Sequence, residues 1–136
     1  MPNITGYAHA ELSVRDLDRS VDWYRELLQA REIFREPNVP EDIVAVALLE
    51  PVSKLVIAFT QHLHGDPDPF SAKRAGLDHL AFYVGAREEL DAWAARLDEL
   101  SIAHDGVQER PGGRSAGLTF RDPDSIVLEF FWAAGR

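Results

Sequence analysis

The amino-acid sequence predicts an α+β fold in which two β-α-β-β-β modules form a cupped, eight-stranded mixed sheet. The first observation behind this prediction is an internal repeat. The segment His-Ala-Glu-Leu-Ser-Val begins at His9 and the segment His-Leu-Ala-Phe-Tyr-Val begins at His79, an interval of 70 residues (79 − 9). Trp93 follows Trp23 at the same interval (93 − 23). Self-similarity at a fixed spacing is typical of a duplicated structural unit.

The second observation is that the ends of the two halves also correspond. Leu-Val-Ile-Ala-Phe at 55–59 aligns with Ile-Val-Leu-Glu-Phe at 126–130, an offset of 71 residues (126 − 55). One small loop difference accounts for the change from 70 to 71. In this alignment His9 is the counterpart of His79, and Ala58 is the counterpart of Glu129.

In the first half, apolar and polar residues alternate from Ala8 to Val14, which predicts a strand with one apolar face. A helix is expected next, with Asp16 or Asp18 near its start as a cap. Its apolar positions recur at steps of four, three and four: Leu17, Val21, Tyr24 and Leu28. Three more strands are expected at residues 31–36, 43–50 and 54–61.

The second half repeats this order. We expect a strand at 77–84, a helix at 87–100 and strands near 103–109, 116–121 and 126–132. Gly65, Pro67 and Pro69 interrupt both periodicities between the halves, which indicates a linker. The sequence therefore predicts one domain over residues 1–136, with modules at about 5–62 and 77–133 and a linker at about 62–76.

Composition excludes several classes of function. Acidic residues outnumber basic ones by 23 to 14, and a net charge of −9 disfavours nucleic acid or an anionic membrane surface as a partner. The chain has no cysteine, so any metal must be held by histidine and carboxylate. It also lacks a secretion signal and an apolar run of the roughly 18 residues that span a bilayer. We expect a cytoplasmic protein.

Three residues are candidate metal ligands. By the strand alternation His79 lies on the polar face of its strand, as does His9, and Glu129 lies in a strongly apolar last strand. A carboxylate there is costly unless it is exposed, paired or bound to a cation. Two histidines and one carboxylate suit a divalent ion, with Fe(II) favoured and Mn, Zn, Ni or Co as alternatives. A single histidine on a strand is more often hydrogen-bonded or exposed than a ligand, so the repeat is what strengthens this prediction.

Other polar and aromatic residues have simpler interpretations. Glu11 shares a face with His9, and a catalytic or supporting role and plain surface exposure are both open. His62, His64 and His104 are expected to face solvent. Trp23 and Trp93 are expected to have a packing role rather than to stack on a ligand. Basic residues that could converge from loops are Lys73, Arg74, Arg110 and Arg114.

The chain resembles the vicinal-oxygen-chelate superfamily, which includes glyoxalase I, extradiol dioxygenases and bleomycin resistance proteins. The resemblance covers nearly the whole chain and is most specific at residues 9–24, 77–82 and 120–130. It implies a metal-centred cupped sheet, with His9, His79 and Glu129 at ligand positions. The fourth ligand position is Ala58, which can neither bind metal nor accept a proton. The resemblance therefore favours a dioxygenase-like site, although Ser125 replaces the glycine usual after the Asp-Pro turn.

Three hypotheses follow. The chain is a metal-dependent enzyme acting on a small oxygen-bearing molecule, either a dioxygenase-type oxidoreductase or a glyoxalase-type lyase or isomerase, with Glu129 and Glu11 as candidate catalytic residues. Alternatively, it is a metal-free protein that binds or sequesters a small compound, or a fold retained for dimerisation or regulation. Phe130, Phe131 and Trp132 provide apolar surface near the C-terminus, and we expect a homodimer.

Overall fold

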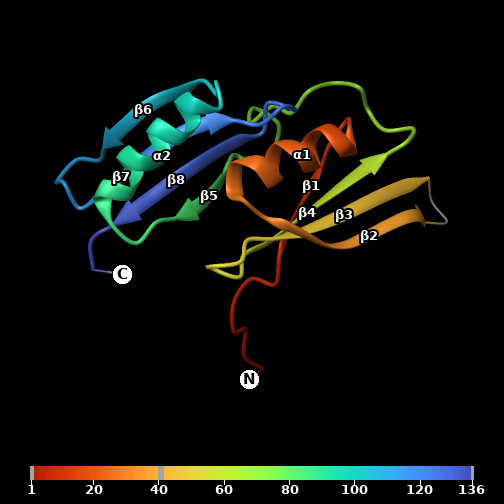
Figure 1. The fold of residues 1–136 in the computed structure, drawn as a ribbon, viewed down its shortest axis with the longest axis horizontal. Coiled ribbons are helices and arrows are strands. Elements are labelled where there is room, and N and C mark those ends of the chain that lie inside the picture. Colours follow the sequence, from red (N-terminus) through yellow and green to blue (C-terminus); the bar gives the residue numbers. More distant parts are fainter. Residues whose placement is uncertain (1, 40–41, 136) are drawn as a thin grey trace. The chain divides into compact units, whose positions relative to one another are not determined.

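The computed structural model describes residues 2–39 and 42–135 and contains two compact units, Met1–Asp68 and Pro69–Arg136. Each unit has the element order β-α-β-β-β, with its strands in one four-stranded sheet (Figure 1). The predicted α+β class and the predicted pair of modules are therefore confirmed. The described residues include no helix long and apolar enough to cross a membrane.

The described residues of the first unit form one helix and four strands. They are β1 (Ala10–Ser13), α1 (Leu17–Leu28), β2 (Arg31–Val39), β3 (Ile43–Leu49) and β4 (Val56–His62). The strand order is β1-β4-β3-β2, with β1 parallel to β4 and the other pairs antiparallel. β2 is therefore at one edge of the sheet. It ends at Val39, three residues beyond the predicted end at 36, and its pairing with β3 is irregular between Glu36 and Val39.

The second unit repeats the same topology. Its elements are β5 (Leu80–Tyr83), α2 (Arg87–Glu99), β6 (His104–Glu109), β7 (Ser115–Arg121) and β8 (Val127–Ala133). The strand order is β5-β8-β7-β6, with β5 parallel to β8. The register matches the first unit as well, because Glu11 is opposite Ala58 and Ala81 is opposite Glu129. The predicted correspondence of residues 55–59 with 126–130 is thus present in the strand pairing.

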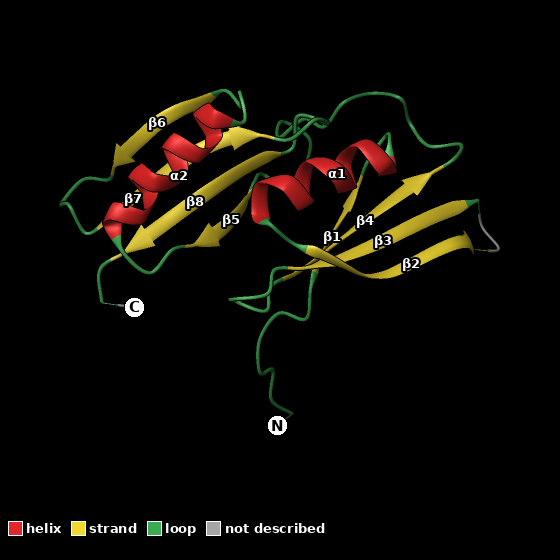
Figure 2. Cartoon of the chain, viewed as in Figure 1, coloured by secondary structure: helices red, strands yellow, loops and turns green. Residues whose placement is uncertain are grey.

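Each helix packs on one face of its own sheet (Figure 2). The four predicted apolar positions of α1 are all buried, and the Tyr24 ring lies 4.6 Å from that of Phe59 on β4. On α2, Leu90 and Leu97 are buried and the Trp93 ring stacks on Phe130 at 4.1 Å. The helix covers the apolar side of the strands, so the opposite side is left for polar residues.

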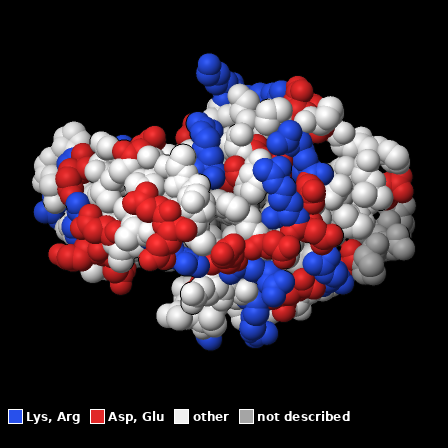
Figure 3. Space-filling model, turned by 45° about the horizontal axis from the view of Figure 1, so that its top comes forward, with Lys and Arg blue, Asp and Glu red and all other residues white. Residues whose placement is uncertain are grey.

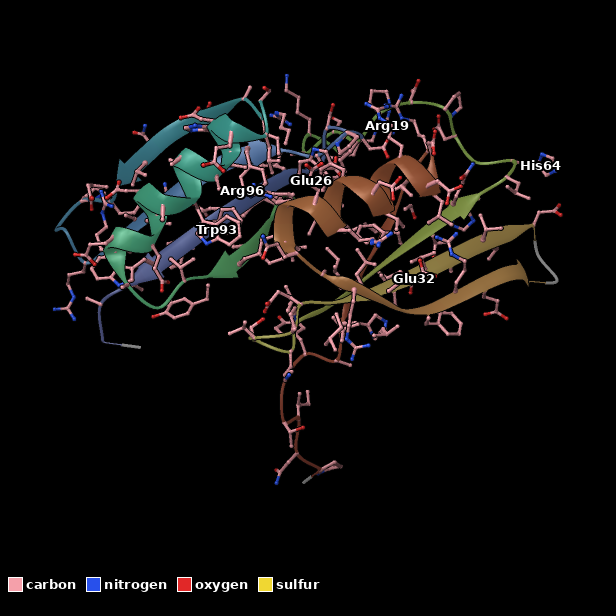
Figure 4. The ribbon with its side chains drawn as sticks, viewed as in Figure 1. Arg19, Glu26, Glu32, His64, Trp93 and Arg96 are labelled. Atoms are coloured by element: carbon pink, nitrogen blue, oxygen red, sulfur yellow. The ribbon has the colours of Figure 1, made fainter. Side chains whose placement is uncertain are left out.

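Both tryptophans pack as predicted. Trp23 makes an edge contact with Tyr24 at 4.7 Å, and Trp93 lies between α2 and β8 (Figure 4). The starts of β1 and β5 differ from the prediction. His9 and His79 each precede the first paired residue of their strands by one position, rather than lying within the strands.

Candidate metal centre

The second unit brings two of the predicted ligands together. The Nε2 atom of His79 lies 3.5 Å from Oε2 of Glu129. The strand pairing produces this approach, because Glu129 is opposite Ala81 and His79 is two residues before Ala81. Two atoms that each lie about 2.1 Å from one ion are about 3.0–3.4 Å apart at ordinary coordination angles. The observed 3.5 Å is about 0.1 Å longer than this range, so a shared divalent ion would need only a small approach of the two side chains.

Asp78 holds the His79 imidazole from the other side. Its Oδ1 atom lies 2.7 Å from Nδ1 of His79. A proton on Nδ1, donated to this carboxylate, leaves the lone pair of Nε2 directed toward Glu129. A carboxylate on the second nitrogen is the usual arrangement for a histidine that binds a metal.

Gly117 makes room for the Glu129 side chain. It lies on β7, next to β8, and a Cβ atom there would overlap Oε1 of Glu129 and lie 3.0 Å from its Cδ. The equivalent residue in the first unit is Ala45, which is opposite Thr60 just as Gly117 is opposite Phe131. The glycine is therefore needed only in the unit whose sheet has the glutamate.

Arg110 neutralises the same carboxylate. Its Nη2 atom donates a hydrogen bond of 2.9 Å to Oε1 of Glu129. The glutamate side chain is only 7% exposed, whereas the arginine side chain is 53% exposed. The backbone N–H of Arg110 donates to the carbonyl of Ser115, which closes the turn between β6 and β7. The buried carboxylate thus has a cationic partner on one oxygen and an imidazole near the other.

The first unit has a polar cluster that includes His9 and Glu11. Glu11 lies beside the small Ala58, and its Oε1 accepts a hydrogen bond from the hydroxyl of the buried Thr60. Its Oε2 lies 3.8 Å from Nε2 of His9. Both side chains are about half exposed. Glu11 is therefore held in place by a neighbouring strand and is not simply a solvated surface residue.

The predicted site residues thus fall into two groups, His9 with Glu11 in the first unit and His79 with Glu129 in the second. Within residues 2–39 and 42–135, no three His, Asp or Glu side chains are grouped so as to hold a metal ion. The three-ligand site from His9, His79 and Glu129 remains a prediction.

The remaining histidines differ from one another. His62 and His64 are exposed as predicted, and His64 projects beyond the end of β4 near Asp42 (Figure 4). The prediction for His104 is wrong. Its side chain is 14% exposed, with Nε2 3.2 Å from Asp98 and Nδ1 accepting from the backbone of Gly106. A histidine that opens a strand beneath a helix end can satisfy both nitrogens without solvent.

Sequence reasoning missed the partners that support each candidate. Asp78 directly precedes His79, and this adjacent Asp-His pair could have predicted that the carboxylate contacts the imidazole. Arg110 was one of several loop cations, and its contact with Glu129 depends on how the turn closes.

On the face drawn in Figure 3, basic and acidic side chains are interspersed, with no continuous basic surface of the kind that nucleic acid binds.

Comparison with known proteins agrees with this architecture. Residues 6–130 match the family model of the Glyoxalase/Bleomycin resistance protein/Dioxygenase superfamily. The crystal structure of a glyoxylase/bleomycin resistance protein/dioxygenase domain from Frankia sp. EAN1pec is 35% identical, with 96% of this chain and 99% of that chain covered and a TM-score of 0.86.

A more distant solved structure is a point variant of the fosfomycin resistance protein FosX from Listeria monocytogenes, complexed with Mn(II) and 1S,2S-dihydroxypropylphosphonic acid. It is 21% identical, covers 98% of this chain and 95% of that chain, and has a TM-score of 0.74. At this identity the likeness concerns the fold alone. The family model and the Frankia structure go further: the chain belongs to the glyoxalase/bleomycin resistance protein/dioxygenase superfamily.

Proposed function

We propose that the chain is a metal-dependent enzyme of this superfamily, acting on a small oxygen-bearing molecule bound to a divalent ion. His79 and Glu129 are two of the ligands and His9 is the third. The observation that carries the proposal is the 3.5 Å approach of His79 Nε2 to Glu129 Oε2, with Asp78 orienting the imidazole. The Mn(II) complex of the FosX variant supports a divalent ion in this fold.

Two residues of the first unit, Ala58 and Glu11, favour one class of reaction. A bound ion would polarise adjacent substrate oxygens or activate dioxygen. Ala58 provides no second carboxylate, which favours dioxygenase-type chemistry over glyoxalase-type isomerisation. Fe(II) is the favoured ion, with Mn, Zn, Ni or Co as alternatives. Glu11 is the candidate general base, because a hydroxyl from Thr60 holds its carboxylate while half of the side chain stays accessible.

A metal-free binding protein is the second candidate function. The ion pair between Arg110 and Glu129 favours it, because this pair already balances the buried carboxylate without a metal. Metal content separates the two functions. An enzyme of the proposed kind retains a divalent ion, and a sequestering protein of the alternative kind does not.

The test is Mn(II) binding to chelator-treated protein, followed by calorimetry and by metal analysis after gel filtration. We predict one Mn(II) per chain for the wild type. His79→Ala and Glu129→Ala should lose it, because two remaining ligands seldom hold a labile ion. His9→Ala should also lose it if the third ligand is correctly assigned.

His62→Ala and His64→Ala are matched controls, because both side chains are exposed and neither contributes to the proposed site. Both should bind Mn(II) as the wild type does. Full Mn(II) loading of His79→Ala would exclude the proposed ligand set. A wild-type protein that takes up none of the five candidate metals would favour the binding function instead.

A further inference from the structure

We propose that β2 pairs antiparallel with β2 of a second copy of this chain, so that the first sheets of the two copies join edge to edge. This interface does not depend on the proposed metal site. It also differs from the apolar surface expected near the C-terminus, because β2 belongs to the first unit. Three features of β2 support the proposal: its place in the sheet, the order of its charges and one extra residue in its pairing with β3.

The first feature is an edge with an exposed apolar centre. β2 is the last strand of the first sheet, and among the described residues no strand pairs with its outer edge (Figure 1). The unpaired backbone groups of such an edge can bind another strand. At the middle of β2, Ile33 and Phe34 are 44% and 51% exposed. A second β2 would cover both residues and supply partners for the edge.

The second feature is that the charges around this centre are self-complementary. Residues 31–36 read Arg-Glu-Ile-Phe-Arg-Glu. When two such segments run antiparallel about a two-fold axis at their apolar centre, every arginine is opposite a glutamate of the other copy. The opposed pairs are Arg31 with Glu36, Glu32 with Arg35, and Ile33 with Phe34. A two-fold interface requires a surface that complements itself, and opposite charges across paired strands are stabilising.

The third feature is an extra residue that places the opposed charges on the same faces. In a regular strand, side chains three or five positions apart lie on opposite faces. In β2 the pairing with β3 shifts by one residue between Glu32 and Phe34. Glu32 and Arg35 therefore both lie on the helix side of the sheet. Arg31 and Glu36 both lie on the other side, so each charged pair can meet across the interface.

The same features make the edge selective. Charges and bulges on an edge strand ordinarily prevent it from pairing with unrelated strands. In β2 their arrangement fits a second β2, while a strand without the matching charges would leave them opposed or unpaired. The edge strand of the second unit, β6, contains neither lysine nor arginine and offers no such match. The self-complementary edge is therefore a property of the first unit.

The experiment reverses the outer pair, Arg31 with Glu36, because Glu32 and Arg35 already bond within one strand at 2.9 and 3.0 Å. Arg31→Glu and Glu36→Arg each place like charges opposite each other twice in the dimer. Sedimentation equilibrium across micromolar concentrations should show that each single variant dimerises about 10- to 100-fold more weakly than the wild type. The double variant, Arg31→Glu with Glu36→Arg, restores both pairs and should dimerise as the wild type does.

A mixture of the two single variants is the sharpest comparison. Arg31→Glu has glutamate at both positions and Glu36→Arg has arginine at both, so the mixture should form heterodimers with nearly wild-type affinity. Net charge cannot produce this pattern, because the two substitutions change it in opposite directions. Asp105→Arg on β6 is the matched control, since it reverses an exposed charge on the other edge strand and should leave dimerisation unchanged.

A wild-type protein that stays monomeric throughout this range would overturn the proposal. Wild-type affinity in both single variants would overturn it as well, because the interface would then lie elsewhere, such as on the aromatic residues near the C-terminus. Failure of both the double variant and the mixture to restore dimerisation would also contradict it. None of these results depends on metal binding, so the proposed function is tested separately.

Discussion

At the scale of single residues, Glu129 shows how one polar side chain is accommodated in an apolar strand. It is nearly buried between Leu128 and Phe130, both of which are core residues. Its charge is balanced by Arg110, and its volume is accommodated by the missing side chain of Gly117. The first unit has alanine at the equivalent of Glu129 and a Cβ at the equivalent of Gly117.

Gly117→Ala should therefore displace the Glu129 carboxylate. We expect it to lower the free energy of unfolding by about 1–3 kcal/mol, the usual cost of overpacking a buried site, and to reduce Mn(II) retention. Urea unfolding and metal analysis measure the two effects. Gly85→Ala is the matched control, because a Cβ there meets only Glu89 Oε2 at 3.8 Å. Unchanged stability and metal binding in Gly117→Ala would contradict this view of the site.

The sequence pointed to His79 because it repeats His9 on the polar face of its strand, and to Glu129 because a carboxylate interrupts an apolar strand. It could not identify Arg110, which is 19 residues before Glu129 and reaches it only through the closed turn between β6 and β7. His104 was misjudged for the same reason, since its two partners lie on a helix end and a strand backbone. Contacts made by loops and helix ends depend on tertiary geometry that periodicity does not contain.

At the scale of elements, the strand alternation and the helical stripe predicted the order of all ten described helices and strands. The ends of strands were predicted less accurately, because backbone pairing with the neighbouring strand decides where a strand begins and ends. The N-terminal cap of α1 had two candidates in the sequence, and the structure selects Asp16, whose Oδ1 accepts from the N–H of Arg19 at 3.1 Å. Asp18 lies within the first turn of α1.

Asp16→Ala should lower the free energy of unfolding by about 1 kcal/mol, because one backbone donor at the start of α1 loses its acceptor. Thermal and urea unfolding would measure this loss. Asp18→Ala is the matched comparison. Its carboxylate is largely exposed and pairs with Arg35 at 3.2 Å, so its removal should cost only a few tenths of a kcal/mol. Equal effects of the two substitutions would show that Asp16 is not the cap.

The edge strand β2 has an acid-sensitive pair. A hydrogen bond from Arg35 lowers the pKa of Glu32 below its usual value of 4.5, while partial burial opposes this shift. Because the folded pKa is the lower one, the pair stabilises the fold above pH 4.5 and the gain is lost as pH falls through the folded pKa. The effect is small, since the pair is close to solvent.

Glu32→Gln should therefore remove part of the decrease in melting temperature between pH about 5 and 3, with little change at neutral pH beyond the lost ion pair. Melting curves across this range, at low and high salt, measure it. High salt should reduce the difference between wild type and variant. A variant whose acid sensitivity equals that of the wild type would show that Glu32 contributes nothing to it.

At the scale of the whole molecule, duplication explains both what was predictable and what was not. The repeat predicts two equivalent units, and both have the same topology and matching register. The proposed site includes positions at which the two units differ. Glu129, Gly117 and Phe131 in the second unit replace Ala58, Ala45 and Thr60 in the first. The cytoplasmic location stays a prediction.

We expect the chain to form a homodimer. The expectation that Phe130 supplies interface surface is wrong, because its side chain is buried in the core. Phe131 and Trp132 on β8 are only partly buried, and Tyr83 on β5 is 44% exposed, which leaves aromatic surface on neighbouring strands. Such surface is typical of protein interfaces. Sedimentation equilibrium at micromolar concentration should give twice the chain mass of 15.2 kDa. A monomer at that concentration would contradict the prediction.

The most direct test of the central claim is anomalous diffraction from crystals of the Mn(II)-loaded protein. We predict a peak about 2.0–2.3 Å from both Nε2 of His79 and Oε2 of Glu129, the range for such ligands. Nδ1 of His79 should still contact Asp78, and Oε1 of Glu129 should still contact Arg110. A peak bound to other residues, or none at all in protein shown to contain Mn(II), would contradict the assignment of this site.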